Sequence, residues 1–253
     1  MTPKRVVALG ASNLTRGLPT LLALARSAFG PEVELFACLG LGRSYGAGSR
    51  VGFRSLPGIL ESGLWAALET RDRVETRALV TDVGNDILYG HPVPRILEWV
   101  EECVTRLQSF TRDIVVTDLP VASLERVGEA EFLFFRSVLY PPCRLDRAEV
   151  LASARQVSEG LFAMARRRGL RTVCLVRDWY GVDPIHVRLG AWDTAWKEIL
   201  HGNGALPGSG GSSWSEKLRL YALRPERERF FGLERLRRQT GARLSGGGRV
   251  WLY

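Results

Sequence analysis

The strongest constraint on the fold is a repeated alternation between short apolar runs and longer stretches of helical periodicity. Five apolar runs fit buried strands, and they lie at residues 6–9, 33–38, 78–81, 114–117 and 172–176. Helical patterns cover about residues 18–29, 94–110 and 146–168. Because parallel strands need long crossover connections, this order predicts an α/β fold with a central parallel sheet of about five strands and helices on both faces.

Four short polar or glycine-rich runs accompany the ends of these predicted strands, where a parallel sheet gathers its ligands. Together they supply a serine, N–H donors, a histidine and a carboxylate, which are the groups that acyl transfer requires. The runs are Gly10-Ala11-Ser12-Asn13, Leu41-Gly42-Arg43, Gly84-Asn85-Asp86 and Asp183-Pro184-Ile185-His186.

In this order, the four runs resemble the sequence blocks of the SGNH hydrolases, also called GDSL esterases and lipases, over about residues 5–200. The resemblance implies a flavodoxin-like three-layer α/β/α sandwich, a catalytic domain at residues 1–201, and no metal or organic cofactor. One departure is visible: Ala11 stands where the family's Gly-Asp-Ser-Leu signature has its acidic residue, and Asn13 stands in place of the leucine. The acidic residue of that signature is not a member of the family's catalytic triad.

The resemblance also implies the catalytic roles: Ser12 as nucleophile, His186 as base and Asp183 as the carboxylate that orients the histidine. Taken alone, Ser12 would more often be a helix cap or turn residue. The other two histidines have simpler explanations: His91 lies in the loop after Asp86, at the surface or in a pocket wall. His201 follows the last helix of the main domain, where a contact with the C-terminal end of the helix dipole is expected.

The family's oxyanion hole corresponds here to the backbone N–H groups of Ser12 and Gly42 and to the side-chain amide of Asn85. Gly40 is the alternative to Gly42, because the loop holds several glycines. Asn85 could instead form a local Asx turn. The glycine run could also be interpreted as a dinucleotide site with Glu61 as its acidic residue, but such a site needs a helix that opens at the glycines.

The substrate class remains open at the sequence level. The resemblance implies small-molecule carboxylic esters, with thioesters and acetylated sugars as alternatives within the family. Residues 130–140 are rich in large apolar side chains and predict either a cap over an acyl-binding cleft or a helix buried against the sheet. Trp179 and Tyr180 are expected either in the pocket wall or in the core.

Positive charge is concentrated at the end of the chain. Residues 214–253 hold ten Lys and Arg against four Glu, a net of +6 out of the formal +8 of the whole chain. The main domain is therefore not expected to bind nucleic acid. Residues 202–213 predict a Gly/Ser-rich linker, and residues 214–253 a basic C-terminal extension outside the family resemblance.

Within this extension, Pro225 predicts the start of a helix that continues to about Gln239, and residues 249–253 predict a short strand or a docking peptide. Three interpretations stay open. The extension packs on the catalytic domain, lies on an anionic lipid or membrane surface, or binds an acidic partner or nucleic acid.

No apolar run reaches the roughly 18 to 20 residues that a bilayer span needs, and the chain enters a strand-like run at residue 5 without a signal-peptide pattern. We therefore expect a cytoplasmic protein. Its four cysteines lack paired spacing and are expected to be buried or free thiols.

The prediction from the sequence is a serine esterase that works through an acyl-enzyme. An acyltransferase or thioesterase with the same triad is the nearest alternative. A catalytically inactive scaffold that binds an anionic partner through its basic tail is the alternative of another class.

Overall fold

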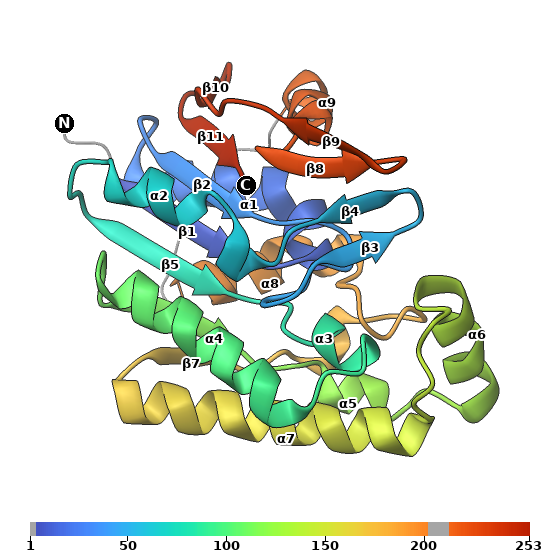
Figure 1. Ribbon diagram of the computed structural model, residues 1–253. Helices are drawn as coiled ribbons and strands as arrows, with labels where there is room; N and C mark the ends of the chain where they lie inside the picture. The colour runs from blue at the N-terminus through green and yellow to red at the C-terminus, as the bar shows by residue number, and fades with distance from the viewer. Residues whose placement is uncertain (1–3, 202–212) are drawn as a thin grey trace.

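The computed structural model describes residues 4–201 and 213–253, so most of the expected linker at residues 202–213 lies outside the described residues. Its centre is a seven-stranded sheet in the order β10-β11-β2-β1-β5-β6-β7, with helices on both faces (Figure 1). The five predicted strands are all present in it as β1 (Arg5–Leu9), β2 (Glu34–Cys38), β5 (Thr76–Val80), β6 (Asp113–Thr117) and β7 (Arg171–Val173). These five strands pair in parallel, which confirms the predicted three-layer α/β/α sandwich.

Two hydrophobic layers separate the sheet from its helices. Successive residues of β1 alternate between them: Val7 and Leu9 enter one cluster, and Val6 and Ala8 enter the other. The first layer packs under α2 (Leu64–Glu69), α4 (Val93–Gln108) and α7 (Arg147–Arg168), and the second under α1 (Ser12–Phe29) and α8 (Trp192–His201). Shorter helices complete the connections: η1 (Ile59–Glu61), α3 (Asn85–Leu88), α5 (Val121–Leu124), α6 (Glu129–Leu139), η2 (Arg177–Trp179) and η3 (Leu189–Ala191).

Helix α1 begins at Ser12, about six residues before the predicted start at residue 18. The N-cap residue Ala11 has no side chain that could accept hydrogen bonds from the first-turn N–H groups. The Asp82 carboxylate, which follows β5, instead accepts hydrogen bonds from the N–H groups of Ala11 at 2.9 Å and Leu14 at 3.1 Å. A cap supplied from 70 residues away leaves no local signal, and for that reason the sequence pattern misses the first turn.

The predicted helix from Pro225 to Gln239 is wrong. These residues form the hairpin of β8 (Arg227–Phe230) and β9 (Leu233–Leu236), which extends the hairpin of β3 (Ser49–Val51) and β4 (Arg54–Leu56) into a second, four-stranded antiparallel sheet. The turn residues Phe231 and Gly232 have φ values of +49° and +80°, as a two-residue type I′ turn requires. Pairing of β8 with β4, whose residues lie 174 to 176 positions earlier, overrides the local helical pattern.

The end of the chain joins the central sheet. After α9 (Trp214–Ala222) and the β8–β9 hairpin, β10 (Ala242–Arg243) precedes β11 (Arg249–Leu252), which pairs in parallel with β2. Trp251 is fully buried and stacks on Phe36 with ring centroids 4.4 Å apart. The sheet therefore has seven described strands instead of five, and residues 249–252 form a core strand.

A buried ion pair ties the same segment to the helix layer. The Arg26 guanidinium of α1 donates to both carboxylate oxygens of Glu216 in α9, at 2.8 and 2.7 Å, and to the carbonyl oxygen of Gly247. Of the open interpretations of the extension, packing on the domain is the one that the described residues show.

Cys38, Cys103 and Cys143 are buried, Cys174 is exposed, and all four are free thiols, as expected. Among the helices of residues 4–201 and 213–253, none has both the length and the apolar character needed to cross a membrane.

Candidate active site

The structure brings the three predicted triad residues together. Ser12 is the first residue of α1, directly after β1, and His186 lies in the loop between η2 and η3. The His186 Nε2 atom is 2.9 Å from Ser12 Oγ, and its Nδ1 atom is 2.6 Å from Asp183 Oδ2. The imidazole thus lies between a hydroxyl and a carboxylate, the arrangement in which it can accept the hydroxyl proton.

The Asp183 carboxylate is held in its charged form. Partial burial raises its pKa, but hydrogen bonds from the His186 ring and from the N–H groups of Ile185 and His186 outweigh burial, so the pKa lies below its usual value. The Arg16 guanidinium is a further positive neighbour, 3.9 Å from Asp183 Oδ2. A charged Asp183 can stabilise a protonated His186.

Asn13 holds the histidine loop against the serine, a role that the sequence analysis did not assign. Its Oδ1 atom accepts a hydrogen bond from the N–H of Val187 at 2.9 Å, and its Nδ2 atom donates to the carbonyl of Ile185 at 2.9 Å and to Asp82 at 3.0 Å. The main chain on both sides of His186 is thereby fixed by the residue next to Ser12. The only available signal was Asn13 itself, a polar residue where the family signature has leucine.

The structure also places Gly42 near Asn85. The Tyr140 hydroxyl donates to Asn85 Oδ1, and a Cβ atom added to Gly42 would lie 3.4 Å from that same hydroxyl. Gly42 has φ +62°, a conformation that glycine adopts without strain. Gly40 lies against a different neighbour, because a Cβ atom added to it would be 2.1 Å from the Leu56 side chain of β4. Of the two glycines, the one beside Asn85 is Gly42.

A buried polar network connects these loops to the last strand. The fully buried Arg43 donates to the carbonyl oxygens of Leu39 at 3.0 Å and Pro57 at 3.2 Å, and to the main-chain oxygen of Tyr253. The Arg43 carbonyl in turn accepts a hydrogen bond from Asn85 Nδ2 at 3.2 Å. The position of Asn85 thus depends on residues about 170 positions further along the chain.

Asp86, next to Asn85, also binds the loop that follows Gly42. Its Oδ2 atom accepts a hydrogen bond from the N–H of Tyr45 at 2.9 Å, and burial raises its pKa. The Tyr89 hydroxyl adds a bond to the Gly42 carbonyl at 2.7 Å. Hydrogen bonds therefore join the loop with Gly42 to the helix with Asn85.

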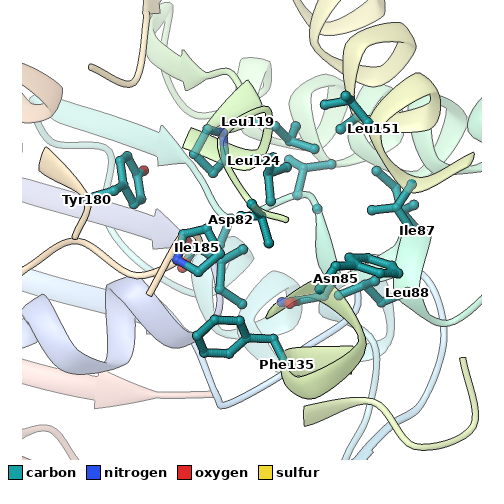
Figure 2. A pocket seen from close by; sticks show the side chains of 18 of the residues that line it. Asp82, Asn85, Ile87, Leu88, Leu119, Leu124, Phe135, Leu151, Tyr180 and Ile185 are labelled. Carbon is teal, nitrogen blue, oxygen red and sulfur yellow. The ribbon is translucent and has the colours of Figure 1, made fainter. Parts of the chain in front are cut away.

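An apolar pocket opens beside Ser12 and Asn85 (Figure 2). Its empty volume is about 1080 Å³, part of which is open to solvent. Helix α6 forms one wall: Phe132, Phe135 and Tyr140 line the pocket from this segment, whereas Phe134 is 62% exposed on the outer face. The remaining walls include Ile87, Leu88, Leu119, Leu124, Val150, Leu151 and Leu175. Of the two predictions for residues 130–140, the cap over a cleft is the one observed.

Other predictions for this region divide. Trp179 and Tyr180 both pack in the core, and Tyr180 also lines the pocket. His91 stacks edge-on against Trp99, with centroids 4.8 Å apart. His201 is the last residue of α8, at the helix end where the dipole contact is predicted. Burial and the neighbouring Arg77 and Arg171 lower the pKa of His201 to about 4, so its ring is neutral at pH 7.

The glycine-rich run at residues 40–48 leads into strand β3, and no helix opens at its glycines. The structure thus lacks, in this described segment, the helix N-terminus on which a dinucleotide site depends.

Fold and site together define a class: a three-layer α/β/α protein with a Ser-His-Asp arrangement at the carboxyl edge of a parallel sheet. No known family model matches the sequence, and no curated protein matches it. One solved structure is similar over 80% of this chain and 100% of its own, at 12% identity and a TM-score of 0.52. That match shows a shared fold.

Further similar structures have lower TM-scores. The psychrotrophic esterase EstA from Pseudoalteromonas sp. is 14% identical, with 78% of this chain and 94% of that chain covered and a TM-score of 0.49. A member of the lipolytic protein G-D-S-L family from Veillonella parvula is 10% identical, with 79% and 100% covered and a TM-score of 0.49.

Proposed function

We propose that this protein is a serine hydrolase that cleaves carboxylic esters with an apolar acyl group through an acyl-enzyme. The observation that carries the proposal is the hydrogen-bonded chain Ser12-His186-Asp183, with Ser12 in the wall of an apolar pocket. His186 takes the Ser12 proton as Oγ attacks the ester carbonyl, then returns it to the leaving alcohol. Water, activated by the same imidazole, hydrolyses the acyl-serine.

The oxyanion of each tetrahedral intermediate would be bound by N–H donors from three elements. Ser12 is in the first turn of α1, where backbone N–H groups have no acceptor within the helix and the dipole favours negative charge. The Gly42 N–H and the Asn85 amide would supply the other donors. The Asn85 amide is already oriented, since Tyr140 binds its oxygen and leaves its NH₂ group available toward Arg43 and the site.

The pocket supports an apolar acyl group over a sugar. Its walls are mainly aliphatic and aromatic, with Asp118, Arg136 and Arg147 as charged exceptions. Each methylene buried against the apolar part contributes about 0.8 kcal/mol of binding. An acetylated sugar would leave many hydroxyl groups against these side chains without hydrogen-bond partners, which is costly.

Intact-mass labelling with a fluorophosphonate tests the proposal. We expect one adduct on the parent protein, none on Ser12→Ala, and a strongly slowed reaction on His186→Ala. Ser137→Ala, which alters an exposed serine of α6 outside the triad, is the matched control and should label like the parent. A folded parent that forms no adduct would contradict the proposal and favour the inactive scaffold.

Product analysis then separates the reactions available to an activated serine. With esters of increasing acyl length and an added alcohol acceptor, an esterase releases free acid, whereas an acyltransferase forms a new ester. Thioester substrates in the same panel test the thioesterase alternative.

A further inference from the structure

Two hairpins, far apart in sequence, present a shared cluster of exposed apolar side chains. We define the hairpin patch as Val51, Phe53, Phe230, Phe231 and Leu233, which are all exposed, and the strand pairing puts Val51, Phe230 and Leu233 on one face. Phe53 and Phe231 are 64% and 63% exposed, and their rings stack at the tips with centroids 4.4 Å apart. The Phe231 N–H donates to the Phe53 carbonyl at 2.9 Å, so both tips form one unit.

Phe231 is not explained by folding. It occupies a turn position with φ +49°, where asparagine or glycine is unstrained and a bulky side chain is unfavourable. Its ring is mostly exposed, so burial does not compensate for the backbone conformation. A strained aromatic side chain on an exposed tip therefore indicates a surface that acts on something outside the chain.

Uncompensated positive charge surrounds the patch. Residues 49–56 and 227–238 hold seven arginines and two glutamates, a net of +5. Arg54, Arg227 and Arg237 pair with those glutamates. Arg50, Arg229, Arg235 and Arg238 are exposed and form no ion pair with the described residues. Aromatic tips flanked by arginines that form no ion pair suit a membrane surface, with the rings in the apolar layer and the guanidinium groups at the anionic headgroups.

The patch is connected to the active site. A Cβ atom added to Gly42 would lie 2.7 Å from Val51 Cγ2, so the β3 end of the patch touches the loop beside Asn85. In the view of Figure 1, both hairpin tips and helix α6 lie at the right-hand edge of the molecule. The outer face of α6 adds exposed Leu133, Phe134 and Val138.

We propose that the hairpin patch docks this protein on an anionic phospholipid surface, with Phe53 and Phe231 inserted at the level of the headgroups. The binding rests on the patch itself. Its purpose rests on the proposed function, because a docked enzyme would receive apolar acyl esters from the lipid phase.

Cosedimentation with vesicles tests this in the full-length Ser12→Ala protein, which keeps the patch and cannot turn over lipid. We expect binding to vesicles of phosphatidylcholine with phosphatidylglycerol, weakened by salt, and little binding to phosphatidylcholine alone. Phe231→Asn, which suits the turn, and Phe53→Ser should each lower the partition coefficient at least about tenfold. Arg229→Gln with Arg235→Gln should lower it about 25-fold, at about fivefold for each arginine.

Leu218→Ser, at an exposed apolar position of α9, and Arg166→Gln, at an exposed arginine of α7, are the matched controls and should bind like the parent. Equal binding by the patch variants would overturn the proposal, as would a parent that ignores anionic vesicles. A dimer in sedimentation velocity that Phe53→Ser abolishes would assign the patch to a second copy instead. Vesicle binding and serine labelling are measured separately, so either proposal can fail alone.

Discussion

Asn85 shows how much of the proposed chemistry depends on single side chains. Its amide oxygen is bound by Tyr140 and its amide nitrogen contacts the Arg43 carbonyl, so its donor direction is set before any substrate arrives. A donor fixed in this way stabilises developing charge without reorganisation.

We predict that Asn85→Ala lowers kcat about 10²- to 10³-fold with little change in KM, since the lost interaction belongs to the transition state. Tyr140→Phe removes only the hydroxyl that orients the amide, and it should lower kcat by a smaller factor. Steady-state kinetics on a soluble ester measure both. A large rise in KM at constant kcat for Asn85→Ala would place this amide in substrate binding instead.

Asp118 is a second pocket residue with a testable property. Burial raises its pKa to about 6, against which a hydrogen bond from the N–H of Leu175 at 2.6 Å acts only partly. Between the unfolded pKa near 3.9 and this value, the folded protein holds the extra proton, so stability falls as pH rises through the interval.

Asp118→Asn removes that dependence. As the pH rises from about 5 to about 8, the unfolding free energy of the variant should increase by about 1 kcal/mol relative to that of the parent. Urea denaturation at each pH measures this difference. Asp178→Asn, at an exposed carboxyl, is the control. A difference between parent and Asp118→Asn that stays constant across this range would contradict the assignment.

Helix α6 is the element that gives the pocket its shape. Its inner residues Phe132 and Phe135 line the cavity, and its outer residues Leu133 and Phe134 face solvent. Since a helix places neighbours in sequence on different faces, adjacent phenylalanines of this element separate substrate effects from stability effects.

We predict that Phe135→Trp shortens the preferred acyl chain, because the larger ring fills part of the cavity next to Asn85 (Figure 2). Phe134→Trp adds the same volume on the exposed face and should leave the chain-length profile unchanged. The measurement is kcat/KM over a series of ester lengths. Identical profiles for Phe135→Trp and the parent would show that acyl chains leave the site by another route.

Across the whole molecule, the basic extension is part of the architecture that supports the site. Strand β11 is added to the edge of β2, and Tyr253 accepts a hydrogen bond from the buried Arg43. The ion pair of Arg26 with Glu216 joins the same segment to helix α1, which carries Ser12. Loss of the last strand would therefore disturb the loop that holds Gly42 and Arg43 as well as the core.

We expect Trp251→Ala to destabilise the protein by about 3–5 kcal/mol, as removal of a large buried ring does. Trp214→Ala, where the side chain is 80% exposed, should change stability by no more than about 0.5 kcal/mol. Denaturant unfolding checks both variants. An unchanged midpoint for Trp251→Ala would mean that β11 contributes nothing to the folded core.

Sequence patterns were sufficient where neighbouring residues decide the outcome. The five inner strands follow from apolar runs buried on both faces, and α7 follows from apolar side chains at spacings of three and four together with its Asp146 capping box. Ser12, His186 and Asp183 were found because each belongs to a short run with a recognisable order. Their mutual distances agree with the roles that the family resemblance implies.

The patterns failed where distant segments compete with local preference. Residues 225–239 have helical spacing, yet pairing with β4 makes them a hairpin, and α1 starts early because Asp82 caps it from another strand. The choice between Gly40 and Gly42, and the inner and outer faces of α6, likewise depend on contacts with residues far away in sequence. Local order thus specifies the elements and the reacting groups of this chain. Long-range pairing and packing free energies decide the edges of the sheet, the pocket and the exposed hairpin tips.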